Sequence, residues 1–208
     1  MLEHVPHWLG RALRGLRAGV DKLCIAQPEI GDGFEAISLS SPAFAQGGQL
    51  PPRFTADGDG VSPPLVWGDV PEAAACLALI VEDADAPSPQ PIVHAIVWGI
   101  PAGERQLREG AIRADGGGDP DGRDVGRNSY FLEGWLPPDP PTGHGEHRYV
   151  FQLFALADAI DPGDTPGRGA LAKAMAGRVL AAGFLVGTYS RGEEAEIGAF
   201  AATARPVA

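Results

Sequence analysis

Residues 140–149 read Pro-Pro-Thr-Gly-His-Gly-Glu-His-Arg-Tyr, and an almost continuous apolar run follows directly at 149–156. Three other stretches have a comparable pattern: 37–40 alternates apolar and polar residues, while 76–81 and 92–100 are almost wholly apolar. Short runs of this kind, bounded by turn-forming Pro, Gly and Asp, are typical of β-strands. Several short strands joined by long loops predict a mainly β fold, an antiparallel β-sandwich.

The chain has 208 residues, of which 29 are glycine and 20 are proline, and 44% are hydrophobic. This length suits one domain with a sizeable core. Because the Gly and Pro residues have no period, the composition argues against collagen, coiled coil and wholesale disorder. Long stretches at 101–130 and 134–146 lie between the expected strands, and ordered loops of that length are often functional.

The formal net charge is −11, which argues against general nucleic-acid binding, a function that depends on clustered cations. No run of 18 apolar residues exists, so we expect no membrane-spanning helix, and arginines interrupt the N-terminus too often for a signal peptide. Cys24 and Cys76 both have apolar neighbours, which favours two buried thiols over a disulfide. We therefore expect a cytoplasmic protein.

Apolar residues recur at steps of three and four between residues 2 and 23, which predicts an amphipathic helix. Such a helix could pack on the body of the protein or on a second copy, or it could lie on a membrane surface through its basic residues. Residues 26–35 have the composition of a linker. We therefore expect an N-terminal helical arm at 1–35, a main domain at 36–208 and a homodimer.

A second helix is predicted at 168–182, where Ala and Leu dominate, and it should end near Gly183. It follows the last of the apolar runs described above. We therefore expect it to be one of a few helices at the periphery of the sandwich.

Four short stretches carry residues that could do chemistry. Asp83 and Asp85 follow an apolar run, and residues two apart share a face if the strand continues; a turn in which Asp binds its own backbone is the alternative. His94 lies inside an apolar run, where a core histidine with satisfied hydrogen bonds is the usual explanation. The other two stretches are 144–149, with two histidines, and 187–191, with a tyrosine.

Taken together and in order, these stretches and several turns match one known family. The motifs are Leu39-Ser40-Ser41-Pro42-Ala43-Phe44, Thr55-Ala56-Asp57-Gly58, Ser62-Pro63-Pro64-Leu65-Val66-Trp67, Asp83-Ala84-Asp85-Ala86-Pro87, the run 94–101 and the stretch 140–149. On these motifs the chain resembles the phosphatidylethanolamine-binding protein family, also called the Raf kinase inhibitor-like family, in its bacterial and archaeal branch. The resemblance implies an antiparallel β-sandwich with a small pocket for an anion: phosphate, a phosphorylated head group or a carboxylate.

The resemblance also implies which residues bind that ligand. They are Asp83, Asp85, Pro87, His94, Pro140, Pro141, His147, Tyr149 and Tyr189. Histidine rings can donate N–H bonds to an anion, whereas a bare carboxylate would repel it. We therefore expect Asp83 or Asp85 to orient one of the two histidines. Arg148 should point to the opposite face from His147 and form a structural ion pair.

The sequence departs from the family pattern at three positions. Ala84 stands where the family commonly has Pro, which should loosen the turn but leaves both carboxylates in place. Trp135 stands where the family has a phenol, and Pro137 stands where Gly is usual. Because Pro has no backbone N–H, the pocket mouth should be stiffer and more apolar.

The main functional prediction is a small-anion-binding protein that regulates or inhibits a protein target such as a kinase or a protease. No catalytic residue, metal or cofactor is expected. The alternative is an uncharacterised hydrolase that uses the carboxylates and histidines, although the chain lacks the Gly-x-Ser-x-Gly motif of serine hydrolases. A peripheral lipid-binding protein is a third reading, without stable membrane insertion.

Overall fold

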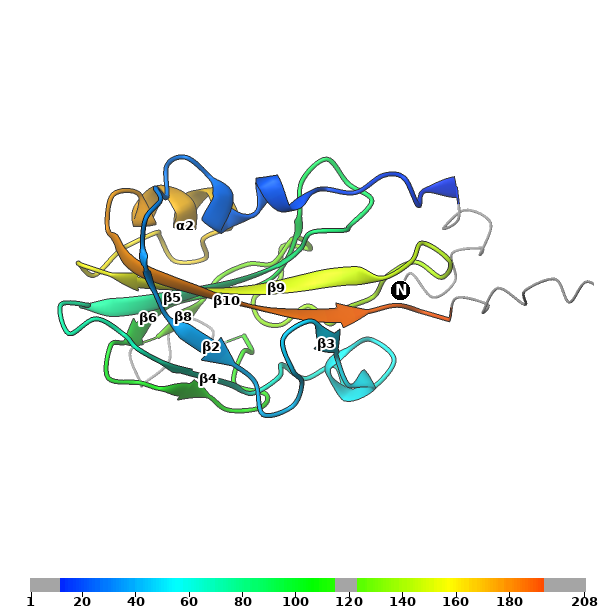
Figure 1. The fold of residues 1–208 in the computed structure, drawn as a ribbon, viewed down its shortest axis with the longest axis horizontal. Coiled ribbons are helices and arrows are strands. Elements are labelled where there is room, and N and C mark those ends of the chain that lie inside the picture. Colours follow the sequence, from blue (N-terminus) through cyan, green and yellow to red (C-terminus); the bar gives the residue numbers. More distant parts are fainter. Residues whose placement is uncertain (1–11, 115–122, 193–208) are drawn as a thin grey trace, which may run out of the picture.

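The computed structural model describes residues 12–114 and 123–192, and these form two β-sheets (Figure 1). The larger sheet has the strand order β1-β10-β9-β5-β6-β8, with β3 also pairing with β10, and the smaller sheet has the order β2-β4-β7. The strands are β1 Glu35–Ala36, β2 Ser38–Ser40, β3 Gly48–Gln49, β4 Leu65–Gly68, β5 Cys76–Asp83, β6 Ile92–Pro101, β7 Gln106–Leu107, β8 Asp124–Val125, β9 His147–Leu156 and β10 Val179–Tyr189. The helical elements are α2 Arg168–Met175 and the 3₁₀ turns η2 Val20–Lys22, η3 Cys24–Ala26 and η4 Pro52–Phe54.

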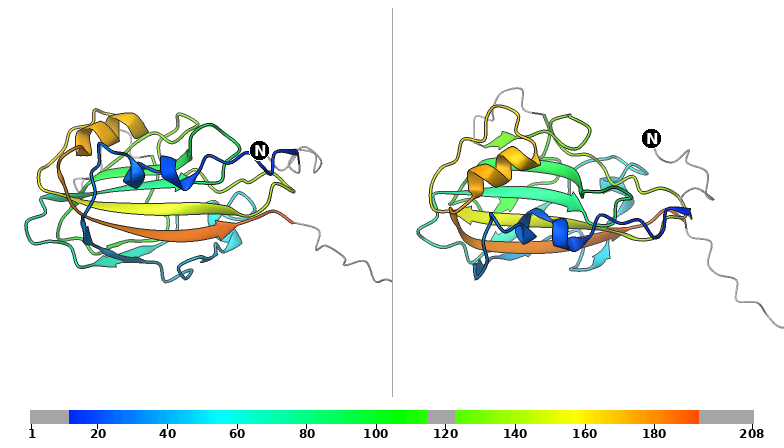
Figure 2. Two further views of the ribbon diagram at one scale, coloured as in Figure 1. Left: turned by 45° about the horizontal axis from the view of Figure 1, so that its top comes forward. Right: turned by 90° about the horizontal axis from the view of Figure 1, so that it is seen from above.

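The central strands are buried on both faces, which explains their almost unbroken apolar sequences. On β9, Phe151 and Leu153 face the core shared with the smaller sheet, while Phe154 and Leu156 face the opposite side. That opposite side is covered by α2 and the N-terminal 3₁₀ turns (Figure 2). The predicted mainly β sandwich with peripheral helices is therefore confirmed, although β1 and β3 pair with β10 in parallel.

The N-terminal part of the chain differs from the amphipathic helix predicted at 2–23, of which residues 1–11 lie outside the described ranges. From Leu13 to Gly19 the chain follows a turn and then an irregular path, and η2 and η3 come next. The backbone N–H of Gly19, whose φ is 101°, donates to the carbonyl of Ala84. A left-handed glycine and hydrogen bonds to a neighbouring loop therefore replace the helical ladder.

Two buried polar side chains explain why η3 docks on the large sheet. Glu82 and Gln152 are both fully buried on its outer face. Their side-chain oxygens accept the backbone N–H groups of Cys24 and Ile25, at 2.6 and 2.8 Å. Cys24 is itself buried, and both cysteines of the chain are free thiols, as the sequence predicts.

The stretch predicted as a linker, 26–35, packs on the same face. Ile30 is 2% exposed, and Phe34 packs against the same core cluster. Glu35 then begins β1, which pairs with β10. Along the described part of this stretch, the chain lies on the sheet instead of spanning open solvent.

The second predicted helix is too long. α2 ends at Met175, and β10 begins at Val179, inside the range predicted as helix. Gly177, with φ 69°, takes the left-handed conformation that ends the helix. Gly183 lies in the middle of β10, where the backbone of Ile37 leaves no room for a Cβ atom. The glycine that looks like a helix end is therefore a close-packing position in a strand.

None of the helices within 12–114 and 123–192 is long and apolar enough to cross a membrane.

Candidate functional site

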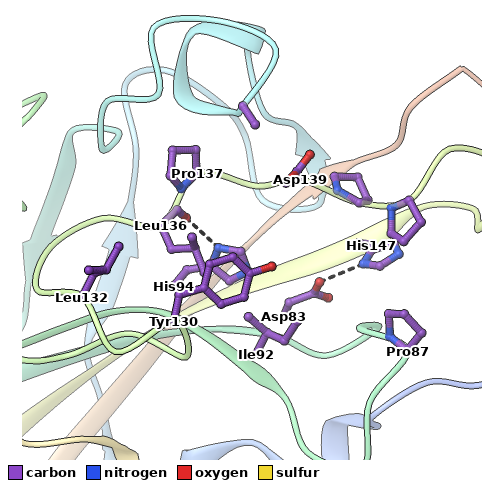
Figure 3. Close-up of a pocket in the computed structure, with 13 residues that line it drawn as sticks. Asp83, Pro87, Ile92, His94, Tyr130, Leu132, Leu136, Pro137, Asp139 and His147 are labelled. Carbon is purple, nitrogen blue, oxygen red and sulfur yellow. Dashed lines mark hydrogen bonds and ion pairs between the residues drawn. The ribbon is translucent and has the colours of Figure 1, made fainter. Parts of the chain in front are cut away.

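A pocket of about 270 Å³ lies at one edge of the large sheet, where β5 ends and where β6 and β9 begin (Figure 3). The antiparallel register brings these ends together, since Asp83 pairs with Ile92 on one side and with Tyr149 on the other. The lining residues are Ala56, Asp83, Pro87, Ile92, His94, Tyr130, Leu132, Leu136, Pro137, Asp139, Pro140, Pro141 and His147. Six of the nine residues implied by the family resemblance are among them: Asp83, Pro87, His94, Pro140, Pro141 and His147.

His94 presents an unpaired nitrogen at this pocket. Its Nδ1 lies 2.7 Å from the carbonyl oxygen of Leu136, which can only accept, so Nδ1 carries a proton (Figure 3). Burial lowers the pKa of His94, which is 4% exposed, so its ring is neutral near pH 7. The Nε2 atom is then a hydrogen-bond acceptor, and among the described residues it has no partner.

Asp83 orients the second histidine. Its Oδ2 accepts a hydrogen bond from His147 Nδ1 at 2.8 Å (Figure 3). Its Oδ1 accepts the backbone N–H of Asp85 at 2.8 Å. His147 is 1% exposed, and its Nε2 lies 2.7 Å from Nδ1 of His144. The expectation that a carboxylate fixes one of the two pocket histidines holds for Asp83 and His147.

Asp85 does not line the pocket. Since β5 ends at Asp83, the chain turns, and the two carboxylates do not share a strand face. Asp85 instead accepts two hydrogen bonds from the Arg148 guanidinium, at 2.7 and 2.8 Å. It also forms an ion pair with Arg17 at 2.7 Å. Burial alone would raise the pKa of Asp85, but the hydrogen bonds from Arg148 and Arg17 outweigh it and hold that pKa at about 2. The ion pair predicted for Arg148 is therefore confirmed.

The two tyrosines implied by the resemblance lie behind the pocket wall. Tyr149 is fully buried, with its ring edge-on to His94 at a centroid distance of 5.0 Å. Its hydroxyl has no hydrogen-bond partner within the part of the chain that the structure describes, and burial raises its pKa well above the ordinary value. Tyr189 donates from its hydroxyl to Asp57 at 2.8 Å. Arg191 binds both Asp57 and Asp139, which links this cluster to the pocket lining.

Sequence reasoning missed Tyr130 and Leu132 as lining residues, and it placed Leu136 and Asp139 only within the stretch 135–141 that resembles the family's pocket rim. These residues lie in an irregular loop, where no hydrophobic period places a side chain. One local signal was available: Asn128 favours turns, and its Oδ1 accepts the backbone N–H of Tyr130 at 2.9 Å. In the described ranges no Lys or Arg lines the pocket, and no group of three or more His, Cys, Asp or Glu side chains is placed to hold a metal ion.

Comparisons with known proteins agree on one family. A sequence profile described as phosphatidylethanolamine-binding protein matches residues 40–190. A UPF0098 protein of Methanothermobacter thermautotrophicus is 39% identical over 156 residues, which are 75% of this chain and 100% of that protein. The UPF0098 protein of Aquifex aeolicus is 34% identical over 162 residues, covering 76% of this chain and 91% of that protein.

Solved structures give the same result. The crystal structure of Escherichia coli YbcL, described as a new member of the mammalian family, has a TM-score of 0.70 and 28% identity, covering 75% of this chain and 99% of that one. The homologue CT736 from Chlamydia trachomatis has a TM-score of 0.67 and 33% identity, covering 76% and 99%. In both sequence and fold, this chain belongs to the phosphatidylethanolamine-binding protein family.

Proposed function

We propose that the pocket binds a small, singly protonated anion, such as the monoanion of phosphate or of a phosphorylated head group. The observation that carries this proposal is the buried Nε2 of His94, an unpaired acceptor at the pocket. A ligand that donates an O–H there satisfies an atom whose burial is otherwise costly. The family's name, which refers to a phosphorylated lipid, supports the same ligand chemistry.

The charges around the pocket support a protonated ligand over a fully ionised one. Asp83 and Asp139 both line the pocket, so a dianion would meet two carboxylates. Asp83 is balanced by its hydrogen bond to His147, and Asp139 is balanced by Arg191. An anion that brings its own proton, or that draws one to His94, meets the least repulsion.

In this proposal the nine residues have different tasks. Asp83, Pro87, His94, Pro140, Pro141 and His147 surround the ligand. Tyr149 packs edge-on against the ring of His94 and limits where that ring can move. Tyr189 donates to Asp57, which shares Arg191 with the lining residue Asp139. Asp85 holds the start of β9 by accepting the backbone N–H of Arg148.

The test uses inorganic phosphate and phosphoethanolamine with the full chain. A ligand at several times its Kd should raise the melting temperature of the wild type by about 3 °C. His94→Leu keeps the volume but removes Nε2, so the shift should disappear. Arg178→Ala, an exposed change at the opposite end of β10, is the control and should keep the shift. No shift in the wild type at millimolar ligand would rule the proposal out.

The pH dependence of binding provides a second check. Because burial lowers the pKa of His94, the free site holds a neutral ring near pH 7. A bound anion favours the protonated ring, and a protonated ligand is itself more abundant at lower pH. The affinity for phosphate should therefore rise as pH falls from 8 towards 6, by up to about tenfold per pH unit. Affinity that stays constant or falls contradicts the assigned role of His94.

The regulatory role belongs to the same proposal. A protein target, such as a kinase or a protease, would meet the exposed edge formed by Tyr130, Phe131 and Leu132, of which Phe131 is 79% exposed. Asn128 accepts the N–H groups of Tyr130 and Leu132 and holds Phe131 at a φ of 62°. An exposed aromatic residue held in a strained conformation beside a ligand pocket supports a binding role for this edge.

Three other sequence-based expectations remain proposals: the homodimer, the cytoplasmic location and the boundary between 35 and 36. The exposed apolar side chains Phe131 and Phe184 support self-association, and the two buried free thiols support a reducing compartment. Light scattering at micromolar concentration tests the dimer, since a monomer mass would refute it. Cell fractionation tests the location.

A further inference from the structure

The segment Leu13–Gly19 docks on the two loops that carry the pocket carboxylate and the pocket histidine. Arg14 Nε donates to the carbonyl of Gly143 at 2.7 Å, and Arg17 donates to the carbonyl of Glu146 at 2.9 Å. The backbone N–H of Ala18 donates to the carbonyl of Ala86 at 3.0 Å. The match to the family profile covers residues 40–190, so this segment lies outside the matched residues.

A further contact of this segment is made by His144, which connects the segment to the pocket residue His147. Nε2 of His144 lies 2.8 Å from the carbonyl oxygen of Leu13 and 3.2 Å from that of Leu16. Carbonyl oxygens only accept, so Nε2 of His144 must carry a proton. The other nitrogen of His144, Nδ1, faces Nε2 of His147 at 2.7 Å.

The hydrogen-bond path from Asp83 to Leu13 therefore has three steps: Asp83 to His147, His147 to His144, and His144 to the backbone carbonyls of the segment. Each of these hydrogen bonds needs one proton. Two neutral imidazoles supply only two protons. With both rings neutral in this arrangement, two bare lone pairs would face each other across 2.7 Å. The observed geometry therefore requires one additional proton, either on one of the two histidines or on the Asp83 carboxyl.

The surroundings assign this proton to His147. Asp83 Oδ1 accepts the backbone N–H of Asp85 and its Oδ2 lies 2.8 Å from His147 Nδ1, so the ionised carboxylate pairs directly with a charged His147. Burial lowers the pKa of His144, the charge on His147 and the nearby Arg17 lower it further, and the Leu13 and Leu16 carbonyls only partly oppose them.

Other charged or titratable groups near His144 and His147 come from β6, from β9, from the turn after β5, from the loop before β9 and from the N-terminal segment itself. His94 faces from β6, and Arg148 and Tyr149 flank His147 on β9. Asp85 is neutralised by Arg148 and Arg17, and Glu146 precedes β9 in the same loop. Within residues 12–114 and 123–192, Asp83 is the carboxylate that is hydrogen-bonded to His147 or His144.

We infer that the N-terminal segment sets the charge of the pocket: by accepting the Nε2 proton of His144, it makes His144 an acceptor towards His147 and keeps His147 doubly protonated. His144 is thus a positioning residue that acts through His147. When the segment is released, His144 can exchange its proton to Nδ1 and donate to His147, which then no longer needs its second proton. The effect on anion binding rests on the proposed function, whereas the protonation of His147 does not.

Nitrogen NMR of the histidine rings near neutral pH reports the protonation directly, and phosphate titration of the same samples reports binding. In the wild type both nitrogens of His147 should carry protons. In His144→Leu, which removes the acceptor without changing formal charge, His147 should lose one proton, and phosphate affinity should fall by about tenfold. In His144→Asn, Oδ1 can replace Nδ1 as the acceptor, so His147 should stay doubly protonated.

The segment itself is tested by the double variant Arg14→Ala with Arg17→Ala, in the full chain. Loss of these anchors should reproduce the His144→Leu spectrum at least in part. Lys22→Ala is the matched control, because it removes a cation from the same part of the chain, one whose Nζ donates to the carbonyl of Pro89 and not to the loop that holds His144. It should leave His147 doubly protonated.

The outcomes separate the two proposals. A singly protonated His147 in the wild type, or one unaffected by both His144→Leu and the double variant, overturns the role of the segment even if phosphate binds. The expected His147 changes without any phosphate binding leave that role standing and refute the proposed function. Failure of His144→Asn to keep the second proton, when His144→Leu loses it, also contradicts the acceptor role of His144.

Discussion

Asp83 and Asp85 are two residues apart, and both are buried at the end of β5, yet they belong to opposite kinds of environment. Asp83 faces the pocket and shares a proton network with a histidine. Asp85 faces away and binds two arginines, which are always charged. The same residue type thus serves a titratable site on one side of the turn and a fixed ion pair on the other.

The difference follows from strand geometry. His147 and Arg148 are adjacent on β9, so their side chains point to opposite faces. The turn after β5 separates the two carboxylates in the same way, and each meets the partner on its own face. Adjacent residues therefore provide proton chemistry on one face and mechanical support on the other.

The largest expected effect on stability comes from the ion-paired side of the turn, where Asp85 binds Arg148 and Arg17. Asp85→Ala removes the acceptor of the Arg148 guanidinium, the Arg148 backbone N–H and Arg17. The free energy of unfolding should fall by about 3 kcal/mol, because Arg148 and Arg17 lose the carboxylate that accepts their hydrogen bonds and balances their charges. Denaturant unfolding measures it, and a loss no larger than that of Asp83→Asn would contradict the comparison.

The two sides should also lose stability in different pH windows. The folded pKa of Asp85 is about 2, below its ordinary value of 3.8, so its contribution is complete above pH 3.8 and is lost as pH falls towards 2. This loss should amount to about 2 kcal/mol. The pKa of His94 is also lowered, by burial, so its contribution is complete above its ordinary value of 6.5 and declines as pH falls below it.

Unfolding measured from pH 8 to pH 2 resolves these windows. His94→Leu should remove part of the loss below pH 6.5 and leave the one below pH 3.8. Asp85→Ala should do the reverse. The same pH profile in both variants would show that the two sides do not titrate separately.

The third effect is smaller in stability but specific to the proton network. In Asp83→Asn, the amide oxygen can still accept the Asp85 N–H, while the amide N–H₂ donates to Nδ1 of His147. His147 then keeps only its Nε2 proton, and every link in the network is still made. Stability should fall by about 1 kcal/mol. The NMR spectrum should show a singly protonated ring, and a doubly protonated ring would contradict the proton count.

The smallest effect is expected from Arg17→Ala. The Arg17 side chain is 37% exposed, and Asp85 keeps its two hydrogen bonds to the Arg148 guanidinium without it. Stability should fall by about 0.5 kcal/mol. A loss as large as that of Asp85→Ala would show that Arg17, rather than Arg148, holds the ion-paired side of the turn together.

The strands that the sequence predicted are those with continuous apolar runs. β5, β6 and β9 are buried on both faces, so their sequences differ sharply from the loops around them. β10 was not predicted as a strand, because the alanines and glycines at its start are typical of a helix and of the glycine that ends one. Gly183 is required there by the close approach of Ile37, a contact that only the pairing with β1 creates.

For the site, the family resemblance implied that Asp83, His94 and His147 share one pocket, and in the structure all three line the same pocket. The sequence could not separate Asp83 from Asp85, since the strand could have continued past Asp83. It also left His144 only as a candidate for hydrolase chemistry, because its partners Leu13 and Leu16 are about 130 residues away in the chain.

Residue types and their local order were enough to predict the family, the core strands and the residues that carry charge and protons. Which of their atoms face each other depends on the fold. Hydrogen bonds depend on distance and direction, so the path from Asp83 through the two histidines to the N-terminal carbonyls exists only once the strand ends and the N-terminal segment meet.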